Sequence, residues 1–361
     1  MKWPSHGSNP HYLYEAIGME KPEIVYDFSA NINPLGPPAN LRENWNALFS
    51  TIQQYPDPDA TSLKEKIVEQ GGIGPDQLLI GNGGAEIIAL IGHWLRGKRV
   101  MIVEPTFSEY EQACRTNHCE VTYFYMKETG EMDVTQLIAQ LPNKDALFLC
   151  NPNNPTGTCL EKQVIEEILT ACEQYNCYFM IDEAFYDFVT GYESLVPLLK
   201  RFPNLILIRS MTKMFAIPGL RLGYTLANRS VIKSLANLQA HWSVNRIAIC
   251  AGELVLHEEG FIERTRKLVD SERERLFQFY RENDFEVSPS KVNFYLLRDR
   301  TLQDQWPLFQ FLLKEGIVPR HTFNFPGLKG RWLRFAIRSE HENTYVIEAM
   351  RKWRVSYPLS L

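Results

Sequence analysis

One segment of this 361-residue chain indicates its fold most clearly, namely Ala146-Leu147-Phe148-Leu149-Cys150-Asn151-Pro152-Asn153-Asn154-Pro155-Thr156-Gly157. Its first five residues are apolar, as in a strand that is buried on both faces of a sheet. The two Asn-Pro steps and the glycine that follow are typical of a rigid turn at the carboxyl end of a strand. An asparagine held there can donate its side-chain amide to a ligand oxygen. Taken alone, the segment fits a plain turn as well as a binding loop.

Short apolar runs of the same kind recur along the chain and alternate with longer amphipathic stretches. The expected strands lie at residues 78–80, 100–103, 121–125, 146–150, 178–181, 205–208 and 222–226. The expected helices between them include residues 85–95, 161–174 and 230–240. This alternation predicts an α/β fold with a mainly parallel seven-stranded sheet covered by helices on both faces. Functional loops are then expected at the carboxyl ends of the strands.

The two ends of the chain depart from this alternation. Residues 1–40 contain several prolines, which break any long helix. After residue 245 we expect a long helical stretch to about 282, an apolar run at 285–297, a strand at 333–337, and helices near 302–315 and 343–353. The sequence therefore predicts a large domain at 41–245 and a smaller α+β domain at 246–361, which the segment 1–40 joins.

Composition excludes several classes of function. The chain is 45% hydrophobic and 22% charged, with a formal net charge of -5, so a nucleic-acid or membrane-surface partner is not expected. It has neither a run of 18 apolar residues nor the apolar core of a signal peptide. The seven cysteines are odd in number and form no CxxC pair, and the histidines form no zinc-ligand spacing. We therefore expect free thiols, no bound metal and a cytoplasmic location.

Two further loops follow expected strands. Gly81-Asn82-Gly83-Gly84-Ala85-Glu86 opens a helix, where glycine and free backbone N–H groups suit a phosphate. It matches neither GxGxxG nor GxxxxGK[ST], so a tight turn is the alternative. Asp182 ends the apolar run at 178–181, where a carboxylate is costly unless it meets a cation or hydrogen-bond donors. A helix cap or a salt bridge is the alternative for Asp182.

A lysine follows the next expected strand, in Ser210-Met211-Thr212-Lys213, with Arg221 eight residues beyond it. Most lysines are solvated surface charges. A lysine in a dry cleft near other cations loses its proton more easily and becomes an amine nucleophile. Ser210 and Arg221 beside it would suit a phosphate. Together the loops supply a phosphate cradle, an acid, an amide donor and a candidate Schiff-base lysine, which are the parts that pyridoxal phosphate needs.

With these motifs the chain resembles the fold-type I pyridoxal-phosphate enzymes of the aminotransferase class I and II superfamily, along nearly its whole length. The resemblance implies that Lys213 binds pyridoxal 5'-phosphate covalently, that Asp182 pairs with its ring nitrogen and that Asn154 bonds its phenolic oxygen. Phe107, in Glu104-Pro105-Thr106-Phe107, matches the aromatic side chain that stacks on the cofactor. The implied phosphate contacts are Gly84, Ala85, Ser210, Arg221 and, from the partner subunit of a homodimer with shared sites, Tyr55.

Two branches of the superfamily compete: the histidinol-phosphate aminotransferases and the threonine-phosphate decarboxylases of cobalamin biosynthesis. The second is the more similar at residues 6–9, 27–36, 216–224, 242–245 and 334–338. Ser8 departs from it, because that branch usually has a second glycine there. Phe185 favours it, because many aminotransferases have a tyrosine at this position. A small phosphorylated amino-acid substrate is implied, with contacts from His6, Asn33, Arg320 and Arg338.

Two rivals come from other classes of protein. A dinucleotide-dependent dehydrogenase is disfavoured by the broken glycine fingerprint. A regulator or scaffold built on the same fold would predict the loss of Lys213 or Asp182, and both are present.

Overall fold

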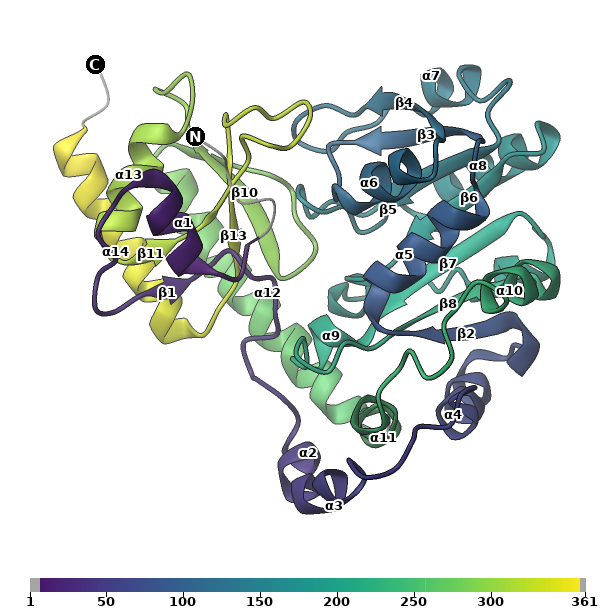
Figure 1. Ribbon diagram of the computed structural model, residues 1–361. Helices are drawn as coiled ribbons and strands as arrows, with labels where there is room; N and C mark the ends of the chain where they lie inside the picture. The colour runs from purple at the N-terminus through teal and green to yellow at the C-terminus, as the bar shows by residue number, and fades with distance from the viewer. Residues whose placement is uncertain (1–6, 257, 358–361) are drawn as a thin grey trace.

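The computed structural model describes residues 7–256 and 258–357, which form two lobes (Figure 1). The larger lobe is built on a seven-stranded sheet in the order β2-β8-β7-β6-β5-β3-β4. The strands are β2 (Leu78–Gly81), β3 (Arg99–Glu104), β4 (Glu120–Tyr125), β5 (Ala146–Cys150), β6 (Tyr178–Asp182), β7 (Leu205–Ser210) and β8 (Gly223–Ala227). β8 runs antiparallel to both of its neighbours, and the remaining pairs are parallel. The predicted α/β fold with a mainly parallel seven-stranded sheet is confirmed.

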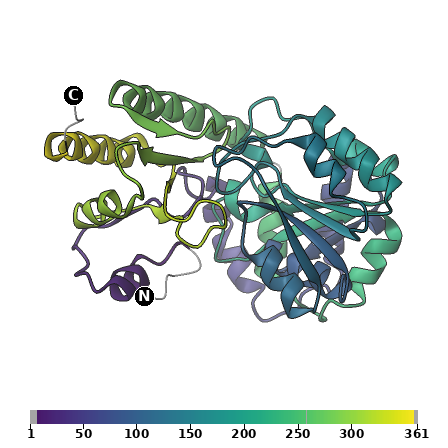
Figure 2. The same cartoon turned by 90° about the horizontal axis from the view of Figure 1, so that it is seen from above.

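Helices cover both faces of this sheet, because its apolar strands are buried on both sides. Those of the larger lobe are α4 (Thr61–Gly71), α5 (Gly83–Trp94), α6 (Glu109–Thr116), α7 (Val134–Ala139), α8 (Lys162–Gln174), α9 (Met211–Met214), α10 (Arg229–Ala236) and α11 (Arg246–Val255). Buried side chains of α5, α6 and α10 form one apolar cluster with alternate strand residues. Those of α4, α7, α8 and α11 belong to a second cluster that continues into the smaller lobe. Figure 2 shows this layering from above.

The smaller lobe is an antiparallel sheet with helices, and both ends of the chain contribute to it. Its four strands, in the order β12-β13-β10-β9, are β12 (Arg320–His321), β13 (Leu333–Ala336), β10 (Phe294–Asp299) and β9 (Phe285–Val287). Its helices are α12 (Glu259–Glu282), α13 (Trp306–Lys314) and α14 (Glu340–Ser356). β1 (Tyr26–Asp27) pairs with β11 (Ile317–Val318), and α1 (Pro10–Ile17) is tied to α13 by Tyr14, whose hydroxyl donates to the Leu313 carbonyl at 2.7 Å.

The remaining elements are short. They are α2 (Ala39–Glu43), α3 (Trp45–Ser50) and three 3₁₀ helices at Pro75–Gln77, Tyr186–Phe188 and Val196–Lys200. Within the described ranges, none of the helices is both long and apolar enough to span a bilayer. All seven cysteines are free thiols.

The expected continuous helical stretch at 245–282 is corrected by the structure. α11 ends at Val255 and α12 begins at Glu259. The break lets the two helices serve different partners, because α11 packs on α2, α3 and α4 whereas α12 packs on β9 and α14. Both segments are amphipathic, so their periodicity alone does not indicate where one helix ends and the next begins.

The strand register aligns the carboxyl ends of β5, β6 and β7 at one edge of the sheet. Cys150 lies opposite Asp182, and Asp182 lies opposite Ile208. The residues that follow β5, β6 and β7 therefore emerge side by side, as expected for parallel strands. The smaller lobe faces this edge.

Candidate active site

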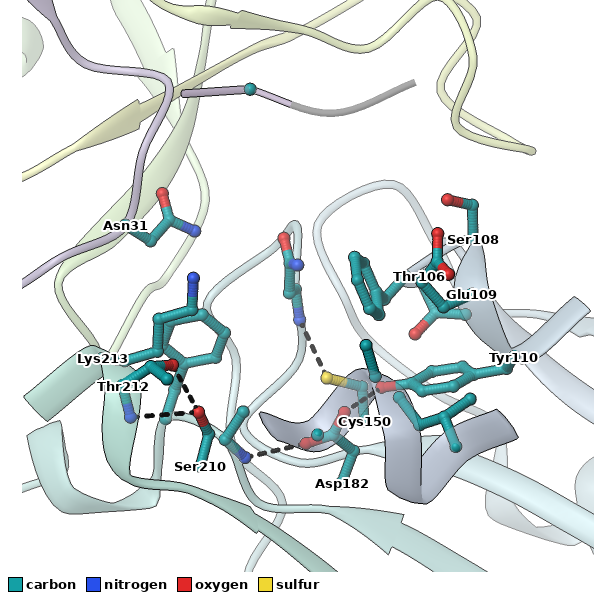
Figure 3. Close-up of a pocket in the computed structure, with 18 of the residues that line it drawn as sticks. Asn31, Thr106, Ser108, Glu109, Tyr110, Cys150, Asp182, Ser210, Thr212 and Lys213 are labelled. Atoms are coloured by element: carbon teal, nitrogen blue, oxygen red, sulfur yellow. Dashed lines mark hydrogen bonds between the residues drawn. The ribbon is translucent and has the colours of Figure 1, made fainter. Parts of the chain in front are cut away.

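A cavity of about 410 Å³ opens between the two lobes at this edge (Figure 3). Nine of the predicted site residues line it: Gly84, Ala85, Phe107, Asn154, Asp182, Ser210, Lys213, Arg221 and Arg320. They come from segments between residues 84 and 320, so the fold brings together what the sequence keeps apart. A cavity of this size is ordinary for a small-molecule or cofactor site.

The amino end of α5 forms a cradle for an anion. Gly83 has a φ of +76°, and a Cβ there would lie 2.8 Å from Nη2 of Arg221. Only glycine therefore lets the guanidinium pack against the start of this helix. Arg221 itself has a φ of +58°, a strained backbone of the kind that clusters at functional sites. The first N–H groups of α5, the hydroxyl of Ser210 and the guanidinium of Arg221 together suit a phosphate.

Lys213 lies in α9, directly after β7, and it projects into the cavity (Figure 3). Burial first, and then the charges of Arg334 and Arg221, lower the pKa of its amine to about 8, against the opposing effect of Asp182. About a tenth of this amine is therefore uncharged at pH 7, far more than for an exposed lysine, and the uncharged amine is the nucleophile.

Asp182 ends β6 with its carboxylate held on both oxygens. Tyr110 donates its hydroxyl to Oδ2 at 2.6 Å, and the Ala184 N–H donates to Oδ1 at 2.9 Å. Burial raises the pKa of Asp182, and these two hydrogen bonds oppose the rise. A buried carboxylate at a cavity wall is stabilised by a ligand cation or N–H donor. Tyr110 had no sequence signal, because it lies in α6 and its partner lies 72 residues away at the end of β6.

We expect Tyr110→Phe to lower kcat/KM about tenfold, since it removes one hydrogen bond to a charged group, worth about 1.5 kcal/mol. Without that hydrogen bond the pKa of Asp182 rises, so the acidic limb of the pH–rate profile should move to higher pH. The matched control is Tyr123→Phe, because the Tyr123 hydroxyl donates to Glu111 instead. An unchanged profile for Tyr110→Phe would mean that the hydroxyl does not support the carboxylate.

Two arginines face the cavity from the smaller lobe. Arg320 and Arg334 are directly opposite each other in the β12–β13 register, and both are buried. Arg334 donates to Asn154 Oδ1 at 2.5 Å and to the Ser29 carbonyl at 2.7 Å, while its Nε has no hydrogen-bond partner within residues 7–256 and 258–357. Burial first, and then the charge of Arg320, lower the pKa of Arg334. The guanidinium stays charged, so this shift is a cost that a bound anion would relieve.

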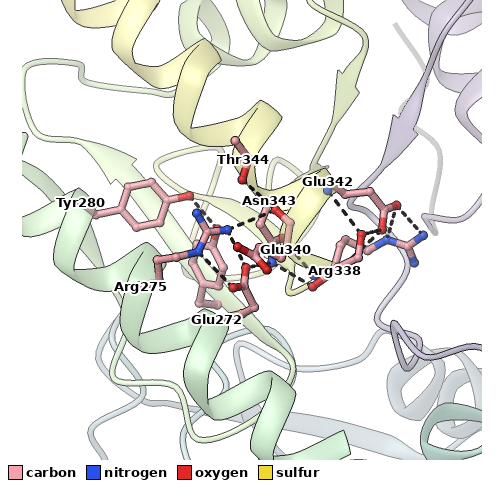
Figure 4. A network of polar contacts seen from close by, with 10 residues as sticks. Glu272, Arg275, Tyr280, Arg338, Glu340, Glu342, Asn343 and Thr344 are labelled. Atoms are coloured by element: carbon pink, nitrogen blue, oxygen red, sulfur yellow. Dashed lines mark hydrogen bonds and ion pairs between the residues drawn. The ribbon is translucent and has the colours of Figure 1, made fainter.

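Arg338, which the sequence predicted to contact the substrate, does not line the cavity, whereas Arg334 does. Arg338 follows β13, and its guanidinium pairs with Glu342 Oε1 at 2.9 Å (Figure 4). Glu342 also completes a capping box with Ser339 at the start of α14. The i,i+4 spacing of Arg338 and Glu342 and this capping box were the available signals that Arg338 is engaged elsewhere.

Asn33 also lies away from the cavity. Its Nδ2 donates to the Met214 carbonyl and to Thr265 Oγ1, both at 2.7 Å, so it anchors the N-terminal segment behind Lys213. Asn31 lines the cavity instead, 3% exposed, and its Oδ1 has no partner among the described residues (Figure 3). The sequence does not distinguish Asn31 from Asn33, because both asparagines belong to one irregular stretch without periodicity.

Two predicted residues remain. Tyr55 is 83% exposed and contacts Trp242, with ring centroids 5.3 Å apart, so it does not reach the cavity of its own chain. His6 lies outside the described residues.

The cavity fits pyridoxal phosphate on its own geometry. The cradle at Gly83 would hold the phosphate, the buried carboxylate of Asp182 would pair with the ring nitrogen, and Asn154 and Lys213 line the same cavity. The fold and this site define a pyridoxal-phosphate-dependent enzyme. The sequence profile of the family described as aminotransferase class I and II matches residues 23–350. The chain belongs to this family, and its cofactor is pyridoxal 5'-phosphate.

Known proteins similar to the chain lie in both branches of the family. The chain is 34% identical over 351 residues to the threonine-phosphate decarboxylase of Salmonella typhimurium, with 96% of each chain covered. A crystal structure of the histidinol-phosphate aminotransferase from Clostridium acetobutylicum superposes with a TM-score of 0.86 at 30% identity, covering 91% of this chain and 99% of that one. The L-threonine-O-3-phosphate decarboxylase from Porphyromonas gingivalis superposes with a TM-score of 0.81 at 29% identity, covering 90% and 98%.

Proposed function

We propose that the chain decarboxylates L-threonine O-3-phosphate to (R)-1-amino-2-propanol O-2-phosphate, with pyridoxal 5'-phosphate as cofactor. The similarity to threonine-phosphate decarboxylases along 96% of the chain supports this activity. The product would supply the aminopropanol linker of cobalamin. A cytoplasmic location fits free thiols and a small, soluble substrate.

The choice of a phosphorylated substrate rests on one observation: each end of the cavity is lined by a pair of basic side chains. Arg221 and Lys213 lie at the cofactor end, and Arg320 and Arg334 lie opposite each other across β12 and β13. The cofactor accounts for the first pair, because Arg221 would contact its phosphate and Lys213 would bind it covalently. The second pair is placed for another anion, and a phosphate dianion suits two guanidinium groups better than a single carboxylate does.

The reaction follows from orientation within this cavity. Pyridoxal phosphate, when bound, supplies an electron sink for the electron pair that is released at the substrate's Cα. Arg320 and Arg334 hold the substrate phosphate and so decide which bond at Cα faces that sink. A bidentate clamp on the departing carboxylate would stabilise the ground state as well and would gain nothing. Lys213 Nζ then delivers a proton to Cα after CO₂ has left.

Phe185 distinguishes this site from many aminotransferases. Its buried ring lies against Phe294, with centroids 4.7 Å apart, at the cavity wall. A tyrosine here would add one hydrogen bond to the cofactor, worth about 0.5–1.5 kcal/mol. Its absence favours decarboxylation over transamination.

The experiment that tests this function uses two mixtures. The cofactor-loaded protein is incubated with threonine O-3-phosphate in one, and with histidinol phosphate plus 2-oxoglutarate in the other. Release of CO₂ and aminopropanol phosphate in the first supports the proposal. Glutamate formation in the second, without CO₂ in the first, would make the chain a histidinol-phosphate aminotransferase.

A homodimer with shared sites belongs to this proposal. Exposed aromatic and aliphatic side chains gather on and near α2 and α3: Trp45, Phe49, Ile52, Tyr55 and Trp242. An apolar surface of this kind indicates an interface with another chain. We expect Tyr55 to reach the cofactor phosphate of the partner subunit.

Mixed dimers test this sharing directly. In a dimer of Lys213→Ala and Tyr55→Ala chains, shared sites place both defects in one site and leave the other site intact. When equal amounts of two weak homodimers are co-refolded, about half of the dimers are mixed and each of these has one intact site, so activity should recover to about a quarter of the wild-type value. If Tyr55 acts within its own chain, the mixture stays as weak as its components.

A further inference from the structure

The loop 322–332 carries part of the substrate end of the cavity and has its own small core. It connects β12 to β13, and its ends meet where Thr322 Oγ1 donates to the Trp332 carbonyl at 2.5 Å. Phe325, Leu328 and Trp332 pack with Leu296 in an apolar cluster separate from the two main ones. A compact loop with close ends and an internal core moves as a unit and is often functional.

This loop positions the cavity-facing groups of the smaller lobe. Asn324 and Phe325 both line the cavity. Asn324 Oδ1 accepts from Arg320 Nη2 at 2.8 Å, and the Arg320 guanidinium lies 5.2 Å from the centre of the Phe325 ring. A shift of the loop would therefore move Arg320.

Glu128 ties this loop to the larger lobe. It follows β4, the edge strand of the seven-stranded sheet, and its Oε2 accepts from Trp332 Nε1 at 2.8 Å and from Arg298 Nη1 at 3.4 Å. Its Oε1 pairs with Arg331. The Arg298 guanidinium stacks 4.5 Å from the centre of the Trp332 ring. One carboxylate thus receives three donors from the loop and from β10.

The turn that carries Glu128 packs against the loop at 151–157, which carries Asn154. The Lys127 N–H donates to the Glu131 carbonyl at 2.8 Å, and the Gly130 N–H donates to the Lys127 carbonyl at 2.8 Å. A Cβ on Gly130 would lie 2.7 Å from Thr156 Oγ1. The turn that carries Glu128 therefore packs against the segment that carries Asn154, whereas the three partners of Glu128 belong to the smaller lobe.

We infer that Glu128 is a positioning residue, which holds the 322–332 loop against the larger lobe and so sets the affinity of the substrate phosphate. Glu128 does not line the cavity, so it acts only through the loop. The inference rests on the proposed function, because the substrate end is identified by its phosphate.

The test compares Glu128→Ala with Glu131→Ala in the cofactor-loaded enzyme. Glu131 lies in the same turn, but its side chain is 68% exposed and pairs only with Lys127, so it is the matched control. Glu128→Ala should raise KM for threonine O-3-phosphate about tenfold and leave kcat within about twofold. Glu128→Gln, which keeps an acceptor for Trp332, should give an intermediate KM.

Hydrogen exchange of the loop provides a readout that needs no turnover. Amides of residues 322–332 should exchange about tenfold faster in Glu128→Ala than in wild type or Glu131→Ala, and inorganic phosphate should slow them in wild type. Wild-type exchange in Glu128→Ala, or faster exchange with an unchanged KM, would overturn the inference. Absence of turnover in the wild type would instead contradict the proposed function, and the exchange comparison would still decide the role of Glu128.

Discussion

Lys213→Ala should lower kcat/KM by at least about 10⁴-fold and abolish the borohydride-reducible bond between protein and cofactor. The amine of Lys213 both binds the cofactor covalently and delivers the proton to Cα, and alanine can do neither. Burial and two neighbouring arginines prepare this amine, because they lower its pKa to about 8.

Mass spectrometry after borohydride reduction checks this prediction. In wild type, the cofactor adduct should map to the peptide that contains Lys213. The matched control is Lys291→Ala, because Lys291 is exposed and its backbone N–H, which alanine keeps, donates to the Gly157 carbonyl. A trapped adduct that persists in Lys213→Ala would show that a different lysine holds the cofactor.

Arg334→Ala should lower kcat/KM about 10²-fold or more, mainly through KM, whereas Arg338→Ala should change it by less than about threefold. A charge-assisted hydrogen bond contributes about 1.5–3 kcal/mol, and the Arg334 Nε, which has no partner among the described residues, can give one to the substrate. Its loss also frees Asn154 Oδ1, which Arg334 holds at 2.5 Å. Arg338 pairs with the partly exposed Glu342, and such pairs contribute little.

Steady-state kinetics with the phosphorylated substrate and circular dichroism of each variant separate these outcomes. Arg334→Lys is the conservative variant, and it should recover only part of the loss because lysine lacks the planar fork. A larger effect at Arg338 than at Arg334 would contradict the placement of the substrate phosphate between β12 and β13.

The sequence predicted most of the larger lobe, because its strands are continuous apolar runs and its functional residues directly follow them. Asp182, Asn154 and Lys213 each come after such a run, and parallel strands bring their carboxyl ends to one edge. This part of the site needs only local sequence and the topology of a parallel sheet.

The smaller lobe was less predictable, because its contributions depend on contacts between distant segments. Arg334 and Arg338 are both arginines of one short motif, and the pairing of β12 with β13, together with the ion pair of Arg338 with Glu342, distinguishes the one that faces the cavity. Asn31 and Asn33 also differ through distant contacts, because Asn33 Nδ2 donates to the Met214 carbonyl and to Thr265 Oγ1. Tyr110 and Glu128 act through partners 72 and 204 residues away, which no motif indicates.

The most direct test of the account follows the carboxyl carbon of L-threonine O-3-phosphate labelled with ¹³C at C1. The cofactor-loaded enzyme receives this substrate together with 2-oxoglutarate, so that both reactions are open to it. We predict that the label leaves as ¹³CO₂ in amounts equal to the aminopropanol phosphate formed, with little glutamate. Label retained in a 2-oxo acid, with glutamate formed in equal amount, would contradict the account.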